Sequence, residues 1–317
     1  MILEILLLVF GFFILIKGAD FFVDGSSSIA TNFKVPKIII GLTIVAFGTS
    51  APEFAVSVKS IISNNHDIVL GNVIGSNIMN ILLILGIASL FKPLIVNNNT
   101  VRKEIPILTL FSSLFAVLIC DNIFDANIAN SFTRSDGIIL SLFFLVFIYY
   151  LISIIRGRQS KEDEIVKMSL PKSIFFTILG ILMIVFGSNF VVNSASSIAT
   201  TIGVSQKLIG LTIVALGTSL PELVTSVVAT RKGECDLAIG NIVGSNIFNI
   251  GIVMGIPVTI FGGISKINFN YIDILVMLIS VMLLFVFAVN DRKITRKEGI
   301  LFLLVFLAYY SIVIIGG

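Results

Sequence analysis

The sequence predicts an all-α polytopic membrane protein whose ten transmembrane helices form two inverted five-helix repeats. Hydrophobic residues make up 56% of the 317 residues and charged residues only 12%, about half the charge of an ordinary soluble domain. Apolar segments of membrane-spanning length recur from one end of the chain to the other. In addition, Gly18 to Gly86 aligns without a gap on Gly187 to Gly255, at an offset of 169 residues.

Ten apolar runs approach the roughly 20 residues that a helix needs to cross the hydrocarbon core. In chain order they cover residues 3–31, 38–60, 68–91, 104–121, 136–156, 173–200, 207–230, 236–262, 271–290 and 298–315. The first and sixth runs are long and end in small polar residues, which suggests tilted or broken helices.

A charged run, RGRQSKEDEIVKM, separates the fifth span from the sixth and is expected to be a solvated cytoplasmic linker over residues 157–172. Residues 1–156 then form the first five-helix repeat and residues 173–317 the second. Because five is an odd number, the second repeat enters the membrane from the opposite side. The duplication is therefore expected to be inverted, as in many transporters.

The positive charges predict the orientation of these spans. If the N-terminus is outside, 16 of the 21 Lys and Arg residues fall in inside loops and four in outside loops. This bias predicts a multi-pass protein of the cell membrane with both termini extracellular. The net charge of +3 thus reflects topology, and no basic patch with interleaved aromatics suggests a nucleic-acid partner. No obligate protein partner is evident, and Cys120 and Cys235 lack the spacing of a metal site.

The residues that could bind a ligand lie in one stretch and its repeat in the second half. Residues 41–60 read GLTIVAFGTSAPEFAVSVKS and residues 210–229 read GLTIVALGTSLPELVTSVVA, with 13 of 20 positions identical. Each places a carboxylate, Glu53 or Glu222, in apolar sequence, where a charge costs about 2.5 to 3.5 kcal/mol on insertion scales. A lone intramembrane Glu can be neutral and hydrogen-bonded to a neighbouring helix. Two in duplicated motifs favour a shared site.

A proline precedes each glutamate. Pro52 and Pro221 each remove a backbone N–H, which frees the carbonyl oxygen four residues earlier, at Gly48 and Gly217. Broken helices in membranes are tolerated where they are buried or line a hydrated cavity. Hydroxyl groups lie beside both breaks, at Thr49, Ser50, Thr218 and Ser219. Carboxylate, hydroxyl and carbonyl oxygens are the hard ligands that bind calcium and sodium.

Each motif is followed by a second repeated segment, GNVIGSN at 71–77 and GNIVGSN at 240–246. Their small residues allow close helix packing. Ser76 and Asn80 are four residues apart and share one helical face, as do Ser245 and Asn249. These two pairs of a hydroxyl and an amide could complete an oxygen cage around the glutamates.

At these residues the chain resembles the short prokaryotic sodium/calcium exchangers of the cation/calcium antiporter superfamily. GTSAPE at 48–53 and GTSLPE at 217–222, each followed by GN..GSN, carry the resemblance, which extends over nearly the whole chain. It implies that spans two, three, seven and eight form an ion-binding core, with Glu53 and Glu222 bridging calcium and sodium positions. The resemblance further implies ligand oxygens from Thr49, Thr218, Ser50, Ser219, Ser76, Ser245 and the freed carbonyls of Ala46 and Ala215, and no cofactor beyond the transported calcium and sodium ions.

One position departs from that pattern. The family often has an acidic residue where this chain has Asn249, and an Asp there is associated with potassium transport in potassium-dependent relatives. The resemblance therefore implies potassium independence. The site is also left with two formal negative charges, which balance one calcium ion but not several sodium ions at once.

Three functions remain open from the sequence. The leading hypothesis is a secondary antiporter that exchanges sodium for calcium by alternating access, with the first and sixth spans as gating helices. A proton-coupled calcium antiporter is the alternative, since a desolvated glutamate can carry a proton, and a passive cation channel is a third possibility. An enzyme is not expected, because the single histidine, His66, lies in a loop and neither GxSxG nor HExxH occurs.

Overall fold

The described residues fold almost entirely into helices. A computed structural model describes residues 2–63, 65–157, 168–204, 213, 215–264, 267 and 270–316. Six of the helices within these ranges are long and apolar enough to cross a membrane, and a bent pair, Lys37–Thr49 with Ala51–Ile62, makes up to seven. The chain is therefore a multi-pass helical membrane protein.

The elements follow the predicted spans closely. The first half contains α1 (Ile2–Asn32), α2 (Lys37–Ile40), η1 (Gly41–Val45), α3 (Ala46–Thr49), α4 (Ala51–Ile62), α5 (His66–Ile78), η2 (Met79–Leu85), α6 (Gly86–Phe91), β1 (Leu94–Ile95), η3 (Thr100–Glu104), α7 (Ile105–Ile119), α8 (Asp121–Phe124) and α9 (Arg134–Gly157). The second half contains α10 (Leu170–Thr201), α12 (Ala215–Thr218), α13 (Leu220–Arg231), α14 (Cys235–Phe248), η5 (Asn249–Met254), α15 (Gly255–Phe261), α16 (Tyr271–Asp291), β2 (Lys293–Ile294) and α17 (Arg296–Gly316). Elements η1, η2, η3 and η5 are π-helical segments.

Three of the ten predicted spans are not among the six or seven described helices that are long and apolar enough to cross a membrane. They coincide with helices α7, α13 and α17. The start of the seventh span, residues 207–212, and most of the expected linker, residues 158–167, lie outside the described residues. The count of ten spans stays a prediction.

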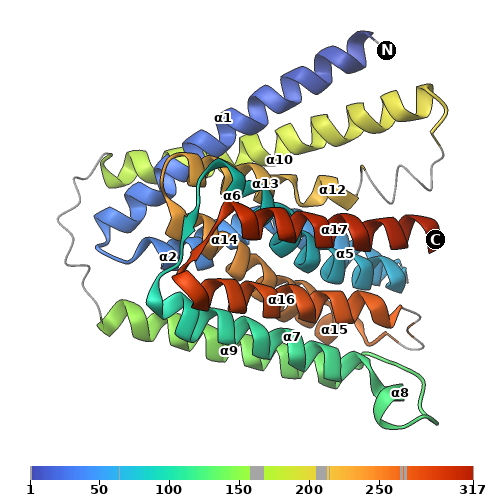
Figure 1. Cartoon of the computed structure of the whole chain (residues 1–317). Helices are drawn as coiled ribbons and strands as arrows, with labels where there is room; N and C mark the ends of the chain where they lie inside the picture. Colours follow the sequence, from blue (N-terminus) through green and yellow to red (C-terminus); the bar gives the residue numbers. More distant parts are fainter. Residues whose placement is uncertain are drawn as a thin grey trace.

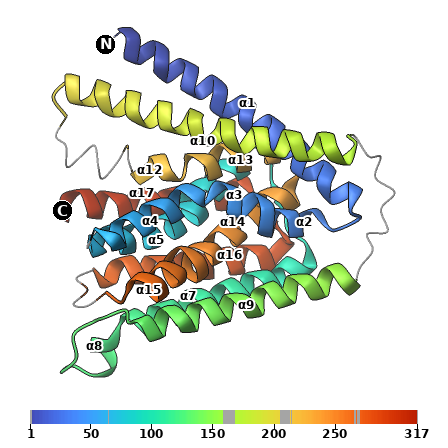
Figure 2. The same cartoon turned by 180° about the vertical axis from the view of Figure 1, so that it is seen from behind.

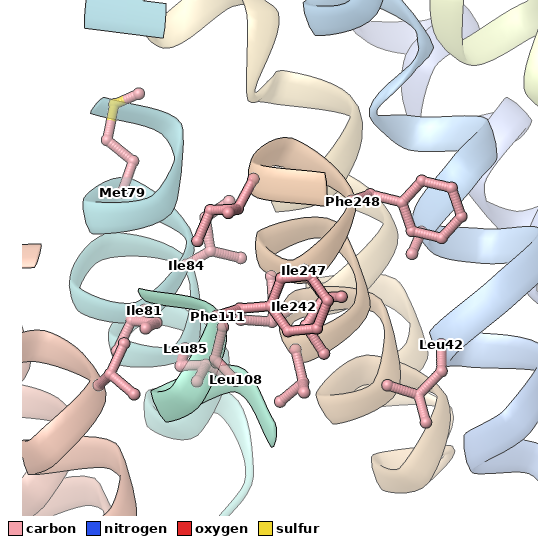
Figure 3. Close-up of a cluster of buried hydrophobic side chains, with 14 of the residues drawn as sticks. Leu42, Met79, Ile81, Ile84, Leu85, Leu108, Phe111, Ile242, Ile247 and Phe248 are labelled. Carbon is pink, nitrogen blue, oxygen red and sulfur yellow. The ribbon is translucent and has the colours of Figure 1, made fainter. Parts of the chain in front are cut away.

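Burial separates a central pair of helices from a lipid-facing shell. The apolar windows of His66–Phe91 and Cys235–Phe261 are 78% and 94% buried, whereas those of the other four long helices are 22% to 33% buried. Figure 3 shows part of the apolar cluster around this pair, with Ile81 and Leu85 of η2 near Leu108 and Phe111 of α7 and Ile242 of α14. The segments that carry GN..GSN are thus the innermost of the fold.

Two long helices, α1 and α10, lie side by side along one flank of the bundle (Figures 1 and 2). They run antiparallel, and glycines let their backbones touch. A Cβ built on Gly18 would lie 2.9 Å from the Ile184 nitrogen, and one on Gly187 would lie 2.7 Å from the Leu15 nitrogen. Real Cβ atoms do not approach backbone atoms so closely, so these positions require glycine and hold the two helices together as one unit.

The loops gather at two opposite ends of the bundle. At one end, β1 pairs antiparallel with β2, with Leu94 opposite Ile294, and Asn97 Nδ2 donates to Asp236 Oδ2 at 3.4 Å. At the other end, Phe132 and Ile264 form a β-bridge. Each contact joins a loop of the first half to a loop of the second. The grouping matches the predicted assignment of these loops to two membrane faces.

The two halves also share features outside the segment that aligns by sequence. The side chain of Tyr150 near the end of α9 donates to Glu104, and Tyr309 of α17 donates to Asp273 at 2.9 Å. Glu104 and Asp273 are 169 residues apart, the same offset as the motifs. Helices α9 and α17 both begin with a capping box, Thr133 to Asp136 and Thr295 to Glu298.

Candidate ion-binding site

Both motif helices break at the serine that precedes Ala–Pro or Leu–Pro. Ser50 has φ −84° and ψ 5°, and Ser219 has φ −90° and ψ 5°, so each stands between two short helices. In the first half the axes on either side differ by 47°. Pro52 and Pro221 lie in the first turns of α4 and α13, where a missing N–H costs nothing. The break predicted from the prolines is present in both copies.

The two glutamates lie at these breaks and are buried inside the protein. Glu53 and Glu222 each expose only 1% of their surface. Each lies in the first turn of its helix, where the free N–H groups and the helix dipole favour negative charge. The sequence expectation that both carboxylates are buried is thus met.

Most of the carboxylate oxygens have no hydrogen-bond partner in the described part of the chain. The hydroxyl of Ser50 donates to Glu222 Oε1 at 3.1 Å, which links the two halves across the site. Glu53 Oε1, Glu53 Oε2 and Glu222 Oε2 are buried and accept no hydrogen bond from the residues that the structure describes. A buried carboxylate without donors is costly, so these oxygens need another positive partner.

Hydroxyl groups of one half meet the buried helix of the other half. Thr49 Oγ1 donates to Asn241 Oδ1 at 3.0 Å and lies 3.5 Å from Ser245 Oγ. In the other half, Ser219, which follows the counterpart of Thr49, has its Oγ 3.5 Å from Ser76 Oγ. The structure therefore brings the serines predicted from GN..GSN next to the hydroxyls of the GTS.PE motifs.

The two predicted asparagines are buried but differ in their bonding. Asn80 Nδ2 donates to Asn246 Oδ1 at 2.9 Å, and Asn246 Nδ2 donates to the Asn77 carbonyl at 3.3 Å. Asn249 is 1% exposed, and neither its amide oxygen nor its amide nitrogen has a partner within the described part of the chain. The same holds for Asn77. The amide groups of this layer are thus only half satisfied by protein.

The first asparagine of each GN..GSN segment was not among the predicted site residues. Asn72 Nδ2 donates to the Glu53 carbonyl and to Ser57 Oγ, both at 3.0 Å. Its counterpart Asn241 donates to Ser226 Oγ at 2.9 Å, and Ser226 is the counterpart of Ser57. These amides fix the glutamate helices against the buried pair. Their repetition at the common offset was the sequence signal that could have found them.

One carbonyl oxygen that was expected to be free, that of Ala46, accepts a helical hydrogen bond. The Ala46 carbonyl, expected to be freed by the break, accepts from Ser50 N at 3.0 Å and lies 3.3 Å from Thr49 Oγ1. The reason is that the helical bond from residue 50 precedes the break. Ala215 and Thr218 bound α12 directly before the second break.

The proline effect itself is visible at Gly217. Its carbonyl oxygen, four residues before Pro221, accepts from Ser188 Oγ of α10 at 3.0 Å. The corresponding position in α1 is Ala19, which has no hydroxyl. In the second half, the carbonyl that the proline leaves without a helical bond thus accepts a hydrogen bond from α10. The first half has no serine at the corresponding position of α1.

The acidic groups that the described structure places at the site are the two glutamates. Among the described residues, no group of three or more His, Cys, Asp or Glu side chains could hold a metal ion together. What the site offers is two carboxylates surrounded by neutral hydroxyl and amide oxygens. Such a donor set suits hard cations such as sodium and calcium, which take oxygen ligands.

Comparison with known proteins agrees with this geometry. A family model described as sodium/calcium exchanger protein matches residues 3–153 and 172–315. The chain is 31% identical to the sodium/calcium exchanger MaX1 of Methanosarcina acetivorans over 96% of both chains. It is 36% identical to the inner membrane protein YrbG of Escherichia coli over 83% of this chain and 82% of that protein.

A solved structure has the same fold. The sodium-calcium exchanger NCX_Mj, soaked with sodium and strontium, superposes with a TM-score of 0.84 at 33% identity and covers 98% of both chains. The match runs through both glutamate motifs and both buried helices. The chain belongs to the sodium/calcium exchanger family of membrane transporters.

Proposed function

We propose that this protein is a secondary antiporter that exchanges sodium for calcium across the cell membrane by alternating access. The observation that carries the proposal is the pair of buried glutamates with three of four oxygens unpartnered by the described residues. Two unpaired carboxylates cannot remain charged in a dry interior. A bound cation supplies the missing charge and ligands.

The exchange of sodium for calcium follows if both ions bind the same carboxylate oxygens. One calcium ion neutralises both carboxylates, and sodium ions that bind the same oxygens must displace it. If the two ions cannot occupy the glutamates together, the inward movement of sodium can drive calcium outward. The rearrangement that exposes the site to one side and then the other needs two states of similar free energy.

An inverted repeat provides two such states. In this proposal residues 1–156 and 173–317 form five-helix repeats of opposite orientation, joined by a cytoplasmic linker, with both termini outside. The common offset of the two motifs, of Glu104 and Asp273, and of Asn72 and Asn241 supports it. Helices α1 and α10, packed through glycines on the flank, are suited to move as one gating unit.

The assigned ligands are Glu53 and Glu222 with the hydroxyls of Thr49, Ser50, Thr218, Ser219, Ser76 and Ser245, the amides of Asn80 and Asn249, and the carbonyls of Ala46 and Ala215. The Ala46 carbonyl already accepts from Ser50 N and lies close to the Thr49 hydroxyl, so an ion bound there would have to take the place of that hydroxyl. The amide of Asn249 has no hydrogen-bond partner among the described residues, and it can turn its oxygen towards a cation.

Radioactive calcium uptake into proteoliposomes tests the coupling ion. A sodium gradient should drive uptake, whereas potassium or proton gradients of equal size should not. Calcium uptake driven by a pH gradient without sodium would instead establish the proton-coupled alternative, and electrical single-channel events would establish a passive channel.

The site assignment is tested in the same vesicles with Glu53→Gln. Its matched control is Glu104→Gln, which removes the charge of a glutamate equally buried at 1% exposure but bonded to Tyr150 away from the motifs. Glu53→Gln should abolish exchange and Glu104→Gln should retain it. Wild-type exchange by Glu53→Gln would show that the site lies elsewhere.

A further inference from the structure

A short turn between α13 and α14 presents two opposite charges to α1 and α2. Gly233 has φ +82° and ends α13 with bonds from its N–H to Thr230 and from Glu234 N to the Ala229 carbonyl, at 3.0 and 2.9 Å. This left-handed turn favours glycine. It separates Lys232 from Glu234 by one residue, so that the two side chains reach different partners.

Lys232 binds α1. Its Nζ lies 2.8 Å from Asp24 Oδ1 and 3.2 Å from Asp20 Oδ1, and it donates to the Asp20 carbonyl at 3.0 Å. One ammonium group thus contacts two successive turns of α1. Lys17 also approaches Asp20, at 3.9 Å, but it belongs to the same helix and joins nothing to α13.

Glu234 binds both sides of the α1–α2 connection. Its Oε2 lies 2.9 Å from Lys37 Nζ, and its Oε1 accepts from Lys37 Nζ at 3.3 Å and from Ser27 Oγ at 3.0 Å. The side chain of Glu234 is only 12% exposed and that of Lys37 22% exposed. Partial burial shields this ion pair from water and salt more than an exposed pair.

These charges have no counterparts in the other half. At the common offset, Asp20 and Asp24 correspond to Asn189 and Asn193, Lys232 and Glu234 to Ser63 and Asn65, and Lys37 to Gln206. All five corresponding residues are uncharged, and Asn189 and Asn193 are exposed. Within the described residues, the ion pairs between the flank and a motif helix lie at this end of the fold.

We propose that Lys232 and Glu234 form an ionic latch that holds α1 and α2 against the α13–α14 turn and keeps that end of the protein closed. The inference rests on the proposed alternating access. Glu222 lies in the first turn of α13 and the latch lies just beyond the last turn. In this proposal, access to the site from this end requires α1 to separate from α13. Opening there breaks the latch, whereas at the other end the five residues that correspond to the latch are uncharged. The latch makes the two states unequal and biases the protein towards closure of this end.

Thiol labelling in nanodiscs, where both ends are accessible, tests the latch. Ser26 of α1 is fully buried, close in sequence to Asp24 and Ser27, and Ser26→Cys is a small change. In a background where Cys120 and Cys235 are serine, a membrane-impermeant thiol reagent reports how often this end opens. Lys232→Met should increase the labelling rate about threefold to tenfold, which corresponds to the loss of a partly buried ion pair. Lys17→Met, the matched control, should leave the rate unchanged.

The Lys37–Glu234 pair provides a second test that does not depend on Lys232→Met folding. Lys37→Glu and Glu234→Lys should each raise the labelling rate, and the double exchange should return it towards the parent value. Equal rates in the parent, the single variants and the double variant would overturn the latch. Calcium uptake by the parent, measured separately, shows whether sodium exchange itself fails, so that the two proposals can fail independently.

Discussion

Replacing Glu53 by glutamine removes one of the two charges that would hold a bound cation. Both oxygens of Glu53 are buried without a hydrogen-bond partner in the described structure, so the substitution breaks no hydrogen bond of this carboxylate there. The substitution should therefore weaken the binding of the cation and leave the protein's own contacts unchanged. Glu53→Gln should therefore fold normally without calcium but lose the stabilisation that calcium gives.

The expected magnitude follows from linkage. Calcium at about 100 times its Kd stabilises the wild type by about 2.7 kcal/mol. Removing one member of a buried charge pair costs about 2 to 5 kcal/mol, and about 3 kcal/mol weakens Kd by roughly 150-fold. The same calcium concentration then stabilises the variant by only about 0.3 kcal/mol.

Thermal unfolding of the purified protein, with and without calcium, measures this difference. At about 2 to 4 °C per kcal/mol, a calcium-induced rise in Tm of about 5 °C or more should shrink to about 1 °C. Glu104→Gln, which changes a buried glutamate outside the motifs, should keep the full rise. A full calcium-induced rise in Glu53→Gln would refute the assignment of this carboxylate.

Three further changes test the packing and the charge of the site. Gly187→Ala places a Cβ 2.7 Å from a backbone nitrogen of α1 and should destabilise the protein by about 1 to 3 kcal/mol in denaturant unfolding, whereas Gly71→Ala, with nothing within 4 Å, should not. Ser188→Ala leaves the buried Gly217 carbonyl without its donor and should lower stability by about 1 to 3 kcal/mol; an unchanged Tm would contradict that role. Asn249→Asp adds a third negative charge and should lower the sodium concentration for half-maximal calcium release, measured by isotope efflux.

The sequence alone was sufficient for the parts of the site that lie in repeated local motifs. The breaks at Ser50 and Ser219 follow from prolines whose effect acts over four residues, and the burial of Glu53 and Glu222 follows from the apolar sequence around them. Membrane insertion also limits the chain to helices. The helix ends could therefore be predicted to within a few residues.

Contacts between distant segments could not be predicted in the same way. The bond from Ser50 to Glu222 joins residues 172 positions apart and depends on how the two halves pack. Ser188 of α10 donates to the Gly217 carbonyl, which Pro221 leaves without its helical hydrogen bond. The counterpart of Ser188 in α1 is an alanine, so the repeat did not indicate this contact. The Ala46 carbonyl is occupied because the break begins one residue later than the expectation required.

The ion pairs of the α13–α14 turn show the limit of arguments from symmetry. A repeat directs attention to positions that are equal in both halves, whereas Asp20, Asp24 and Glu234 differ from their counterparts. Their partners became apparent only from the distances between charged groups in the folded chain. Differences between the halves are where an antiporter with an inverted repeat can acquire a preferred state.

The central claim is that sodium and calcium share the two buried glutamates. Equilibrium binding of radioactive calcium to the purified protein, measured at increasing sodium, tests it most directly. The account predicts that sodium removes all of the bound calcium, that potassium at the same ionic strength does not, and that Glu53→Gln binds little calcium at the outset. Calcium that stays bound at saturating sodium would contradict a shared site.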